Sequence, residues 1–177
     1  HDGLVNIVYR AQGTDMVSRL GLATSNDGFT INERLDTPIF TPIHHAERDG
    51  CEDPRLTVIG DECIMAYTAY RNHDFPVIFQ IALTSINLKD FANRNWNWKE
   101  RSLPFPNVRN KDAVILPNKV DGKYMMFHRI EPSICVSYSE DLKRWHDFKS
   151  IMEPRYGMWD SKKIGAAGTP IELNEGY

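Results

Sequence analysis

An internal repeat constrains the fold of this chain more than any other feature of its sequence. Three segments share one pattern, in which a strand-like run ends in serine and is followed by a polar turn and an aromatic residue: residues 18–29, 79–91 and 133–145. The serines stand at positions 25, 85 and 139, which gives spacings of 60 and 54 residues (85 − 25 and 139 − 85). Repeats of this size are typical of the four-stranded blades of a β-propeller.

Other strand-like segments recur in step with the first pattern. Each repeat also contains an inner run that leads to a turn and a second strand, at residues 53–61, 112–122 and 168–176. An edge-like segment closes each unit, at residues 32–40, 97–105 and 146–152. Alternating runs rich in β-branched and aromatic residues lie between these segments, and no stretch holds the 3.6-residue period of a long helix.

We therefore predict an all-β chain that forms a single domain, residues 1–177, and is part of a β-propeller. The approximate blades are residues 1–45, 46–106 and 107–154, and residues 155–177 start the next blade. Known propellers have about four to eight blades, so about three blades do not close a ring. We expect that the chain is cut at both ends and that the missing blades lie outside it or on a second chain. The alternative fold is a β-sandwich that imitates the repeat by chance.

Charge and composition exclude several functions. The net charge of −3 comes without a basic block, which argues against nucleic acid as a partner. No apolar run approaches the roughly 20 residues that span a membrane, and no signal-peptide pattern opens the chain, so we expect a cytoplasmic protein without a membrane partner. The cysteines at 51, 63 and 135 are odd in number and form no CxxC pair, so neither a zinc site nor a disulfide framework is predicted.

The segment Gly50-Cys51-Glu52-Asp53-Pro54-Arg55-Leu56 is the strongest local candidate for chemistry. Pro54 restricts the residue before it, so we expect an extended backbone at Asp53 that holds the carboxylate at the start of a strand. Arg55 is placed to bind an anion or to orient a carboxylate. The alternative is an ordinary turn with a surface ion pair.

Charged residues stand at equivalent points of the other repeats. Lys111 and Asp112 precede the next inner strand, and Lys163 precedes the last one, while Arg10 and the pair His128-Arg129 follow equivalent strands. Because the inner strands of a propeller surround one axis, we expect these groups to meet there. A site rich in cations around one acid suits a phosphate-bearing reaction. Each residue by itself is equally consistent with a fixed ion pair, and His128 with a structural histidine.

The motifs together resemble the β-mannoside phosphorylases of glycoside hydrolase family 130. The resemblance runs in order over almost the whole chain, through segments 9–11, 18–28, 50–55, 67–70, 111–114, 128–129, 138–142 and 163–166. It implies a five-bladed propeller whose first inner strand and last blade or more are absent from this sequence. It also implies inverting phosphorolysis of β-1,4-mannosides to α-mannose 1-phosphate, with inorganic phosphate as co-substrate and no other cofactor or metal.

The resemblance implies roles for individual residues. Asp53 is expected to be the general acid, with Arg10, Arg55 and Asp112 binding the sugar. The predicted phosphate ligands are Lys111, His128, Arg129 and Lys163. Burial and a neighbouring carboxylate would raise the pKa of Asp53, whereas nearby arginines would lower it; the sequence leaves the balance open.

Two other functions stay open at this point. A β-mannosidase of the same fold would use an acid such as Glu52 or Asp160 as its base, and a glycan-binding fragment would turn nothing over. We expect the loops at residues 72–75 and 155–158 to choose the acceptor sugar. Exposed sheet edges in an incomplete propeller would invite pairing with another chain, including a second copy.

Overall fold

The computed structural model describes residues 3–72, 77–171 and 173–174, and it is almost entirely β-structure. Its helical elements are the five-residue helix α1 (Leu88–Ala92) and one 3-10 turn (His45–Glu47). The strands are β1 (Val5–Gln12), β2 (Ser18–Ser25), β3 (Glu33–Arg34), β4 (Gly50–Ile59), β5 (Glu62–Arg71), β6 (Ile78–Asn87), β7 (Lys111–Ile115), β8 (Tyr124–Ile130), β9 (Ser133–Ser139) and β10 (His146–Met152). The predicted all-β class is confirmed.

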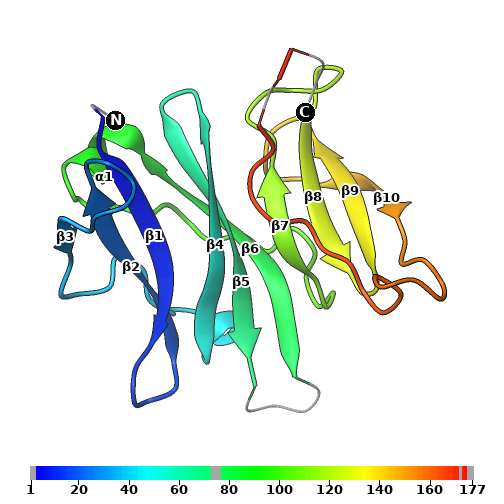
Figure 1. Cartoon of the computed structure of the whole chain (residues 1–177), viewed down its shortest axis with the longest axis horizontal. Helices are drawn as coiled ribbons and strands as arrows, with labels where there is room; N and C mark the ends of the chain where they lie inside the picture. The colour runs from blue at the N-terminus through cyan, green and yellow to red at the C-terminus, as the bar shows by residue number, and fades with distance from the viewer. Residues whose placement is uncertain (1–2, 73–76, 172, 175–177) are drawn as a thin grey trace.

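The strands form antiparallel units that lie side by side (Figure 1). One sheet has the order β1-β2-β4-β5-β6, with β3 paired to β2, and the other has the order β10-β9-β8-β7. A single parallel bridge between Ser18 and Gly50 joins β2 to β4, so the larger sheet consists of two units, β1-β2-β3 and β4-β5-β6. The described residues form no closed ring.

The serine repeat corresponds to one turn that the structure builds three times. Asp27, Asn87 and Asp141 each stand two residues after a repeat serine. Each side-chain oxygen accepts a hydrogen bond from the backbone N–H two residues further on, at 2.8, 2.9 and 2.8 Å. Asp and Asn stabilise turns in this way, so the sequence pattern reflects local hydrogen-bond chemistry.

The unit β4-β5-β6 is buried on both faces. Met65 and Tyr67 of β5 pack toward the unit that contains Leu20 and Leu22. Alternate residues of the same strand, Ile64 and Ala66, join the second core cluster, which includes Ala113, Ile115 and Met126. Because successive residues in a strand point to opposite faces, burial on both faces requires the almost continuous apolar run seen in β5.

Several predicted edge strands are shorter than expected. Segment 32–40 contributes only β3 and a bridge between Leu20 and Phe40, and segment 97–105 contributes one bridge between Leu83 and Ser102. Segment 146–152 is a full strand, as predicted. Residues 168–171 form no strand and Leu173 forms only a single bridge, so the inner strand predicted at 168–176 does not form in the part that the structure describes. A strand needs a hydrogen-bonded neighbour, and residues 168–171 have none among the described strands.

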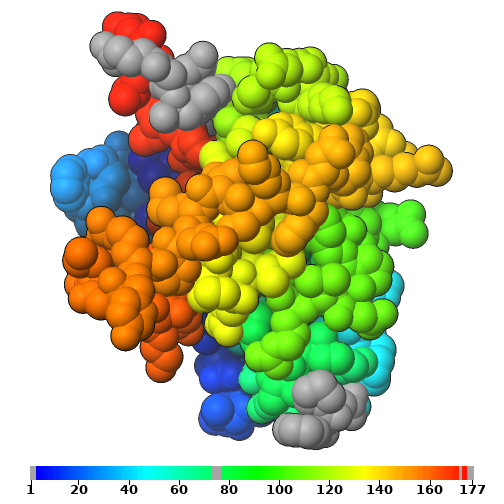
Figure 2. Space-filling view, turned by 90° about the vertical axis from the view of Figure 1, so that its right-hand side faces the viewer, coloured from blue at the N-terminus to red at the C-terminus, as the bar shows by residue number. Residues whose placement is uncertain are grey.

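The chain after β10 follows the outside of the molecule, in orange and red in Figure 2. Tyr156 and Trp159 in this stretch are almost fully exposed. The other predicted acceptor loop, residues 72–75, lies outside the described residues from position 73 onward.

All three cysteines are buried and free. Among the described residues, no helix is long and apolar enough to cross a membrane. In the same part of the chain, no group of three His, Cys, Asp or Glu side chains is arranged to hold a metal ion.

Candidate active site

Asp53 lies in a β-bulge. The pairing of β4 with β5 runs through Glu52 opposite Thr68 and resumes at Arg55 opposite Ala66, so two residues of β4 face one residue of β5. Asp53 has a φ angle of 49°, in the left-handed region. The predicted extended backbone is therefore wrong, because the bulge decides the conformation there. Pro54 is tolerated because it lies in the bulge, where β4 has no ladder hydrogen bond for its missing N–H to break.

The same device recurs in β7. Lys111 pairs with Arg129 and Val114 with Phe127, which leaves two residues of β7 opposite one residue of β8. The first of the two, Asp112, has a φ angle of 59°. Bulges redirect side chains, and Asp is among the residues that tolerate this conformation. The two bulges place two aspartates at equivalent positions of successive sheets.

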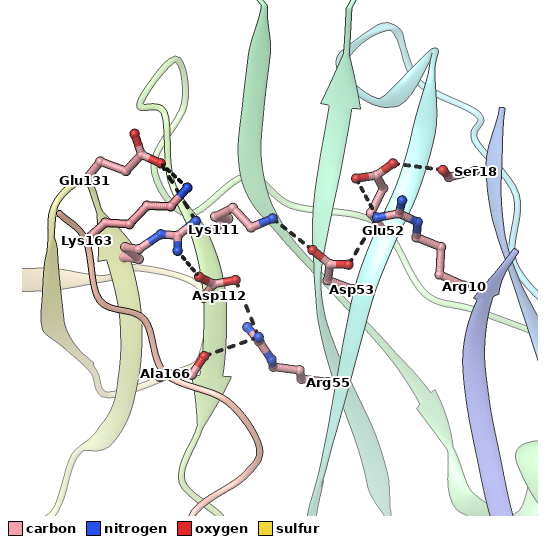
Figure 3. Close-up of polar contacts among 11 residues, drawn as sticks. Arg10, Ser18, Glu52, Asp53, Arg55, Lys111, Asp112, Glu131, Lys163 and Ala166 are labelled. Atoms are coloured by element: carbon pink, nitrogen blue, oxygen red, sulfur yellow. Dashed lines mark hydrogen bonds and ion pairs between the residues drawn. The ribbon is translucent and has the colours of Figure 1, made fainter. Parts of the chain in front are cut away.

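The carboxylate of Asp53 is held by cations from two other strands (Figure 3). Lys111 Nζ of β7 donates to Asp53 Oδ2 at 3.0 Å, and Arg10 Nη1 of β1 donates to Asp53 Oδ1 at 3.3 Å. The same Arg10 nitrogen contacts Glu52 Oε2 at 3.1 Å, and the Ser18 hydroxyl donates to Glu52 Oε1 at 2.8 Å. Strands β1, β2, β4 and β7 therefore meet at this carboxylate pair.

Gly50 permits the close approach of β2 and β4 that this arrangement requires. A Cβ atom at Gly50 would lie 2.7 Å from Ser18 Cβ and 3.2 Å from Ser18 N. Ser18 has no exposed surface, so it is unable to move aside. The absence of a side chain at Gly50 thus keeps the Ser18 hydroxyl within reach of Glu52.

The electrostatic environment of Asp53 stabilises its ionised form. Partial burial raises the pKa of Asp53, but the hydrogen bond and charge of Lys111, with the charges of Arg10 and Arg55, outweigh it. The pKa is therefore below its ordinary value. The sequence left open whether burial or the nearby cations determine the pKa of Asp53, and in the structure the cations do.

Asp112 is less exposed than Asp53 and is also paired with two cations. Arg129 Nη1 lies 3.0 Å from Asp112 Oδ2, and Arg55 Nη2 lies 3.5 Å from Asp112 Oδ1. Arg55 also donates to the carbonyl oxygen of Ala166 at 3.3 Å. A Cβ atom at Gly165 would lie 2.7 Å from Asp112 Oδ2, so the segment after β10 passes directly over this ion pair.

A third carboxylate extends the arrangement. Glu131 Oε1 lies 3.7 Å from Lys163 Nζ and 3.9 Å from Arg129 Nη2. We call the whole group the ionic cluster: the cations Arg10, Arg55, Lys111, Arg129 and Lys163 and the carboxylates Glu52, Asp53, Asp112 and Glu131. The structure thus brings together every predicted site residue except His128.

His128 belongs to the core instead of the ionic cluster. It has no exposed surface. One ring nitrogen contacts the Asn110 side chain and the other lies 2.9 Å from the Ser137 hydroxyl. The ring also stacks on Phe105 at 5.0 Å between centroids. Because both nitrogens are engaged inside the sheet, the structure corrects the assignment of His128 to phosphate. Burial lowers its pKa to about 4.

The sequence reasoning missed two members of the site. Ser18 reaches Glu52 only through packing between β2 and β4, and no local signal points to it. Glu131 stands two residues after Arg129, a spacing that places both on one face of an extended segment. That spacing is a signal that the sequence contained. Asp160, considered as an alternative base, pairs with Arg155 at 2.9 Å in the segment after β10.

A hollow of about 600 Å³ lies on the other face of β1 and β2, lined by residues that include Tyr9, Arg19, Gly21 and Arg34. Tyr9 pairs with Gly21 and Arg10 with Leu20. Since neighbouring residues of a strand point to opposite faces, this hollow faces away from Arg10 and the ionic cluster. The charged groups that converge at Asp53 therefore lie outside this hollow.

The chain is similar to known proteins along almost its whole length. The sequence profile of β-1,4-mannooligosaccharide phosphorylases, glycoside hydrolase family 130, matches residues 3–177. The chain is 38% identical to a 1,2-β-oligomannan phosphorylase of Thermoanaerobacter sp. (strain X514), over 99% of this chain and 59% of that protein.

Two solved structures are also similar. The β-1,2-mannobiose phosphorylase of Listeria innocua, in complex with β-1,2-mannobiose, is 30% identical with a TM-score of 0.77, over 90% of this chain and 44% of that one. A second structure comes from work that describes glycoside hydrolases of the family targeting β-1,2 mannosidic linkages in Candida mannan. It is 28% identical with a TM-score of 0.82, over 99% of this chain and 56% of that one. The chain thus spans about half the length of these relatives.

Proposed function

Because the chain belongs to glycoside hydrolase family 130, we propose that the protein is an inverting β-mannoside phosphorylase with inorganic phosphate as co-substrate. The products would be α-mannose 1-phosphate and a shortened acceptor. The position of Asp53 carries the proposal: one partly exposed acid stands between Arg10 and Lys111, in a cluster where cations outnumber carboxylates.

The surroundings of Glu52 favour a phosphorylase over a hydrolase. An inverting hydrolase needs a second carboxylate that activates a water. Both oxygens of Glu52 are already engaged, one by Ser18 and the other by Arg10. A phosphate nucleophile arrives as an anion and needs no such base, and forked cationic donors match its oxygens.

We assign roles within the ionic cluster on this basis. Asp53 is the general acid toward the glycosidic oxygen. Arg10, Arg55 and Asp112 bind the mannosyl unit, and Arg10, which shares Asp53 with Lys111, also borders the phosphate. The phosphate ligands are then Lys111, Arg129 and Lys163, without His128. Glu52 and Ser18 orient Arg10. No other cofactor is assigned.

We also propose that the units belong to a five-bladed propeller. The turn repeated at Asp27, Asn87 and Asp141, and the bulge repeated at Asp53 and Asp112, support equivalent blades. The remaining blades would then come from outside this sequence. A cytoplasmic location and association with another chain stay predictions.

The linkage is the finer question. Resemblance at the level of sequence motifs favoured β-1,4-mannosides, and the family profile carries that name. A relative that matches along almost the whole chain is a 1,2-β-oligomannan phosphorylase. We therefore place β-1,2-mannosides first and keep β-1,4-mannosides as the alternative substrate.

The test is release of mannose 1-phosphate from β-1,2- and β-1,4-mannobiose, with and without inorganic phosphate. It uses both this chain and the protein encoded by the full open reading frame. Phosphate-dependent product from either mannobiose supports the proposal, and the preferred mannobiose identifies the linkage. Free mannose in the absence of phosphate would instead support a β-mannosidase, and no product from either substrate would leave only a glycan-binding role.

A further inference from the structure

Every cation of the ionic cluster is already paired with a carboxylate. Arg10 and Lys111 contact Asp53, Arg55 contacts Asp112, and Arg129 and Lys163 contact Glu131 within 4.0 Å. The cluster contains five cations and four carboxylates, which gives a net charge of about +1 when all are ionised. Among the described residues, the ionic cluster therefore contains no unpaired cation for a dianion such as phosphate.

An entering oxyanion must consequently take cations from a carboxylate. The carboxylate that loses its partners is left partly buried without compensation. A buried charge of this kind is costly, and carboxylates in that position are neutralised by a proton.

Glu131 and its partner Lys163 are the most exposed pair of the cluster, at 49% and 53%. Water therefore compensates Glu131 when Lys163 turns to an anion, and Glu131 needs no proton.

Of the two aspartates, which are more buried than Glu131, Asp53 is the one whose cations are free to move. The side chains of Arg10 and Lys111 are 44% and 25% exposed, and the Asp53 side chain is 30% exposed. Arg55 and Arg129 around Asp112 are only 18% and 12% exposed.

Further contacts hold the two arginines at Asp112. The carbonyl oxygen of Ala166 accepts from Arg55, and Glu131 contacts Arg129. Gly165 passes over the ion pair between Asp112 and Arg129.

We propose that an oxyanion entering the site draws Lys111 and Arg10 away from Asp53, and that Asp53 takes up one proton from the solvent as the anion binds. The proton moves from water to a carboxylate oxygen, and no other bond changes. This inference rests on the proposed function and deepens it, because binding of the co-substrate would itself protonate the general acid. Without phosphate, Asp53 stays ionised and is unable to donate a proton to a leaving group.

The other charged groups around Asp53 fit this exchange. Glu52 adjoins it on β4 and keeps its own hydrogen bond from Ser18, so Glu52 is not left without a partner when Arg10 moves. Arg55 on β4 acts on Asp53 through its charge alone and remains at Asp112. The cations hold the pKa of Asp53 below its ordinary value, so Asp53 is ionised before the exchange.

The experiment measures protons taken up when sulfate binds to the protein encoded by the full open reading frame. Sulfate remains a dianion throughout the relevant pH range, so any proton taken up belongs to the protein. Isothermal titration calorimetry in two phosphate-free buffers with different ionisation enthalpies gives the number of protons. We expect about one proton per sulfate, and a Kd that rises by up to about tenfold per pH unit, the limit for one linked proton.

Two variants identify the group. Asp53→Asn should still bind sulfate, since both cations are released from the carboxylate, but without proton uptake and without pH dependence. Asp160→Asn removes a carboxylate that pairs with Arg155 outside the ionic cluster and should keep the wild-type uptake. Absence of uptake in the wild-type protein, equal uptake in Asp53→Asn, or failure of both sulfate and phosphate to bind would each overturn the inference.

Failure of the inference is distinguishable from failure of the proposed function. Phosphate-dependent mannose 1-phosphate release without Asp53-linked proton uptake would overturn only the inference. Asp53-linked uptake with no phosphorolysis of either mannobiose would overturn the proposed function and leave the anion exchange intact.

Discussion

Asp53 and Asp112 occupy the same position in successive sheets, each as the left-handed residue of a β-bulge, with φ angles of 49° and 59°. Their side chains differ in access, because Asp53 is 30% exposed and Asp112 is 12% exposed. The same type of bulge therefore holds two carboxylates that differ in solvent exposure. The accessible one suits a proton donor, and the covered one suits a fixed acceptor of hydrogen bonds.

The first prediction concerns Asp53 itself. Replacing it by Asn keeps the size of the side chain but removes the proton that a general acid donates. General acid catalysis contributes roughly 10² to 10⁴ in rate, so we expect kcat for phosphorolysis to fall by about that factor. Mannose 1-phosphate release measures it, and the unfolding temperature checks the fold. Asp160→Asn is the matched control and should stay near wild type; comparable rates for both variants would contradict the assignment.

The second prediction concerns the segment that crosses Asp112. In Gly165→Ala the new Cβ atom would meet Asp112 Oδ2 at 2.7 Å and Arg129 Nη1 at 3.1 Å. Overpacking of this kind costs about 1–3 kcal/mol, so we expect kcat/KM to fall by about tenfold or more as the ion pair is displaced.

Gly168→Ala provides a control in the same segment, because a Cβ atom there would meet nothing within 4 Å. A surface change of this kind should alter kcat/KM by no more than about twofold. Steady-state kinetics on both variants tests the difference. If Gly165→Ala behaved like Gly168→Ala, the segment would have no part in holding Asp112.

The third prediction concerns stability and pH. The pKa of buried His128 is about 4 in the folded protein, against an ordinary value of 6.5. Below pH 6.5 the unfolded chain binds a proton that the folded protein does not, so this group costs stability as the pH falls toward 4. Between about pH 7 and pH 4.5 the cost is about 2 kcal/mol.

His128→Gln removes that titration while keeping a polar side chain near Asn110 and Ser137. We expect the variant to be less stable than wild type at neutral pH because hydrogen bonds to buried groups are lost. The stability difference should then shrink by about 2 kcal/mol at about pH 4.5. Urea unfolding at several pH values measures it, and a difference that stays constant with pH would refute a neutral buried His128.

The fourth prediction compares a buried and an exposed ion pair. Glu47 is 1% exposed and accepts from the Tyr67 hydroxyl at 2.7 Å, while it also pairs with Arg101. Removing one partner of a buried pair costs about 3–5 kcal/mol, so Glu47→Ala should destabilise the protein by about that amount. Glu33→Ala breaks a pair with Arg94 whose side chains are 44% and 46% exposed.

The exposed pair should contribute far less to stability, because solvent and salt screen it. The free energy of unfolding from denaturant titration separates the two variants. Similar losses for both would show that Glu47 does not anchor the turn that precedes β4.

The sequence was sufficient for features that arise from local chemistry. The turn at Asp27 and its repeats could be predicted because an Asx side chain bonds to the backbone two residues further on. The all-β class followed from alternation and from the absence of a helical period. The charged residues of the site were also identifiable, because they stand at equivalent points of a repeat.

Only the tertiary structure decided how those charged residues are used. The contacts of Asp53 with Arg10 and Lys111 join positions 43 and 58 residues apart, and these positions meet only after the sheets have paired and packed. The bulge at Asp53 is a property of two strands together, so it overrides the local preference imposed by Pro54. Adjacent residues of β8 point to opposite faces. This is why His128 entered the core while Arg129 joined the ionic cluster, a choice that depends on which face of the sheet another sheet covers.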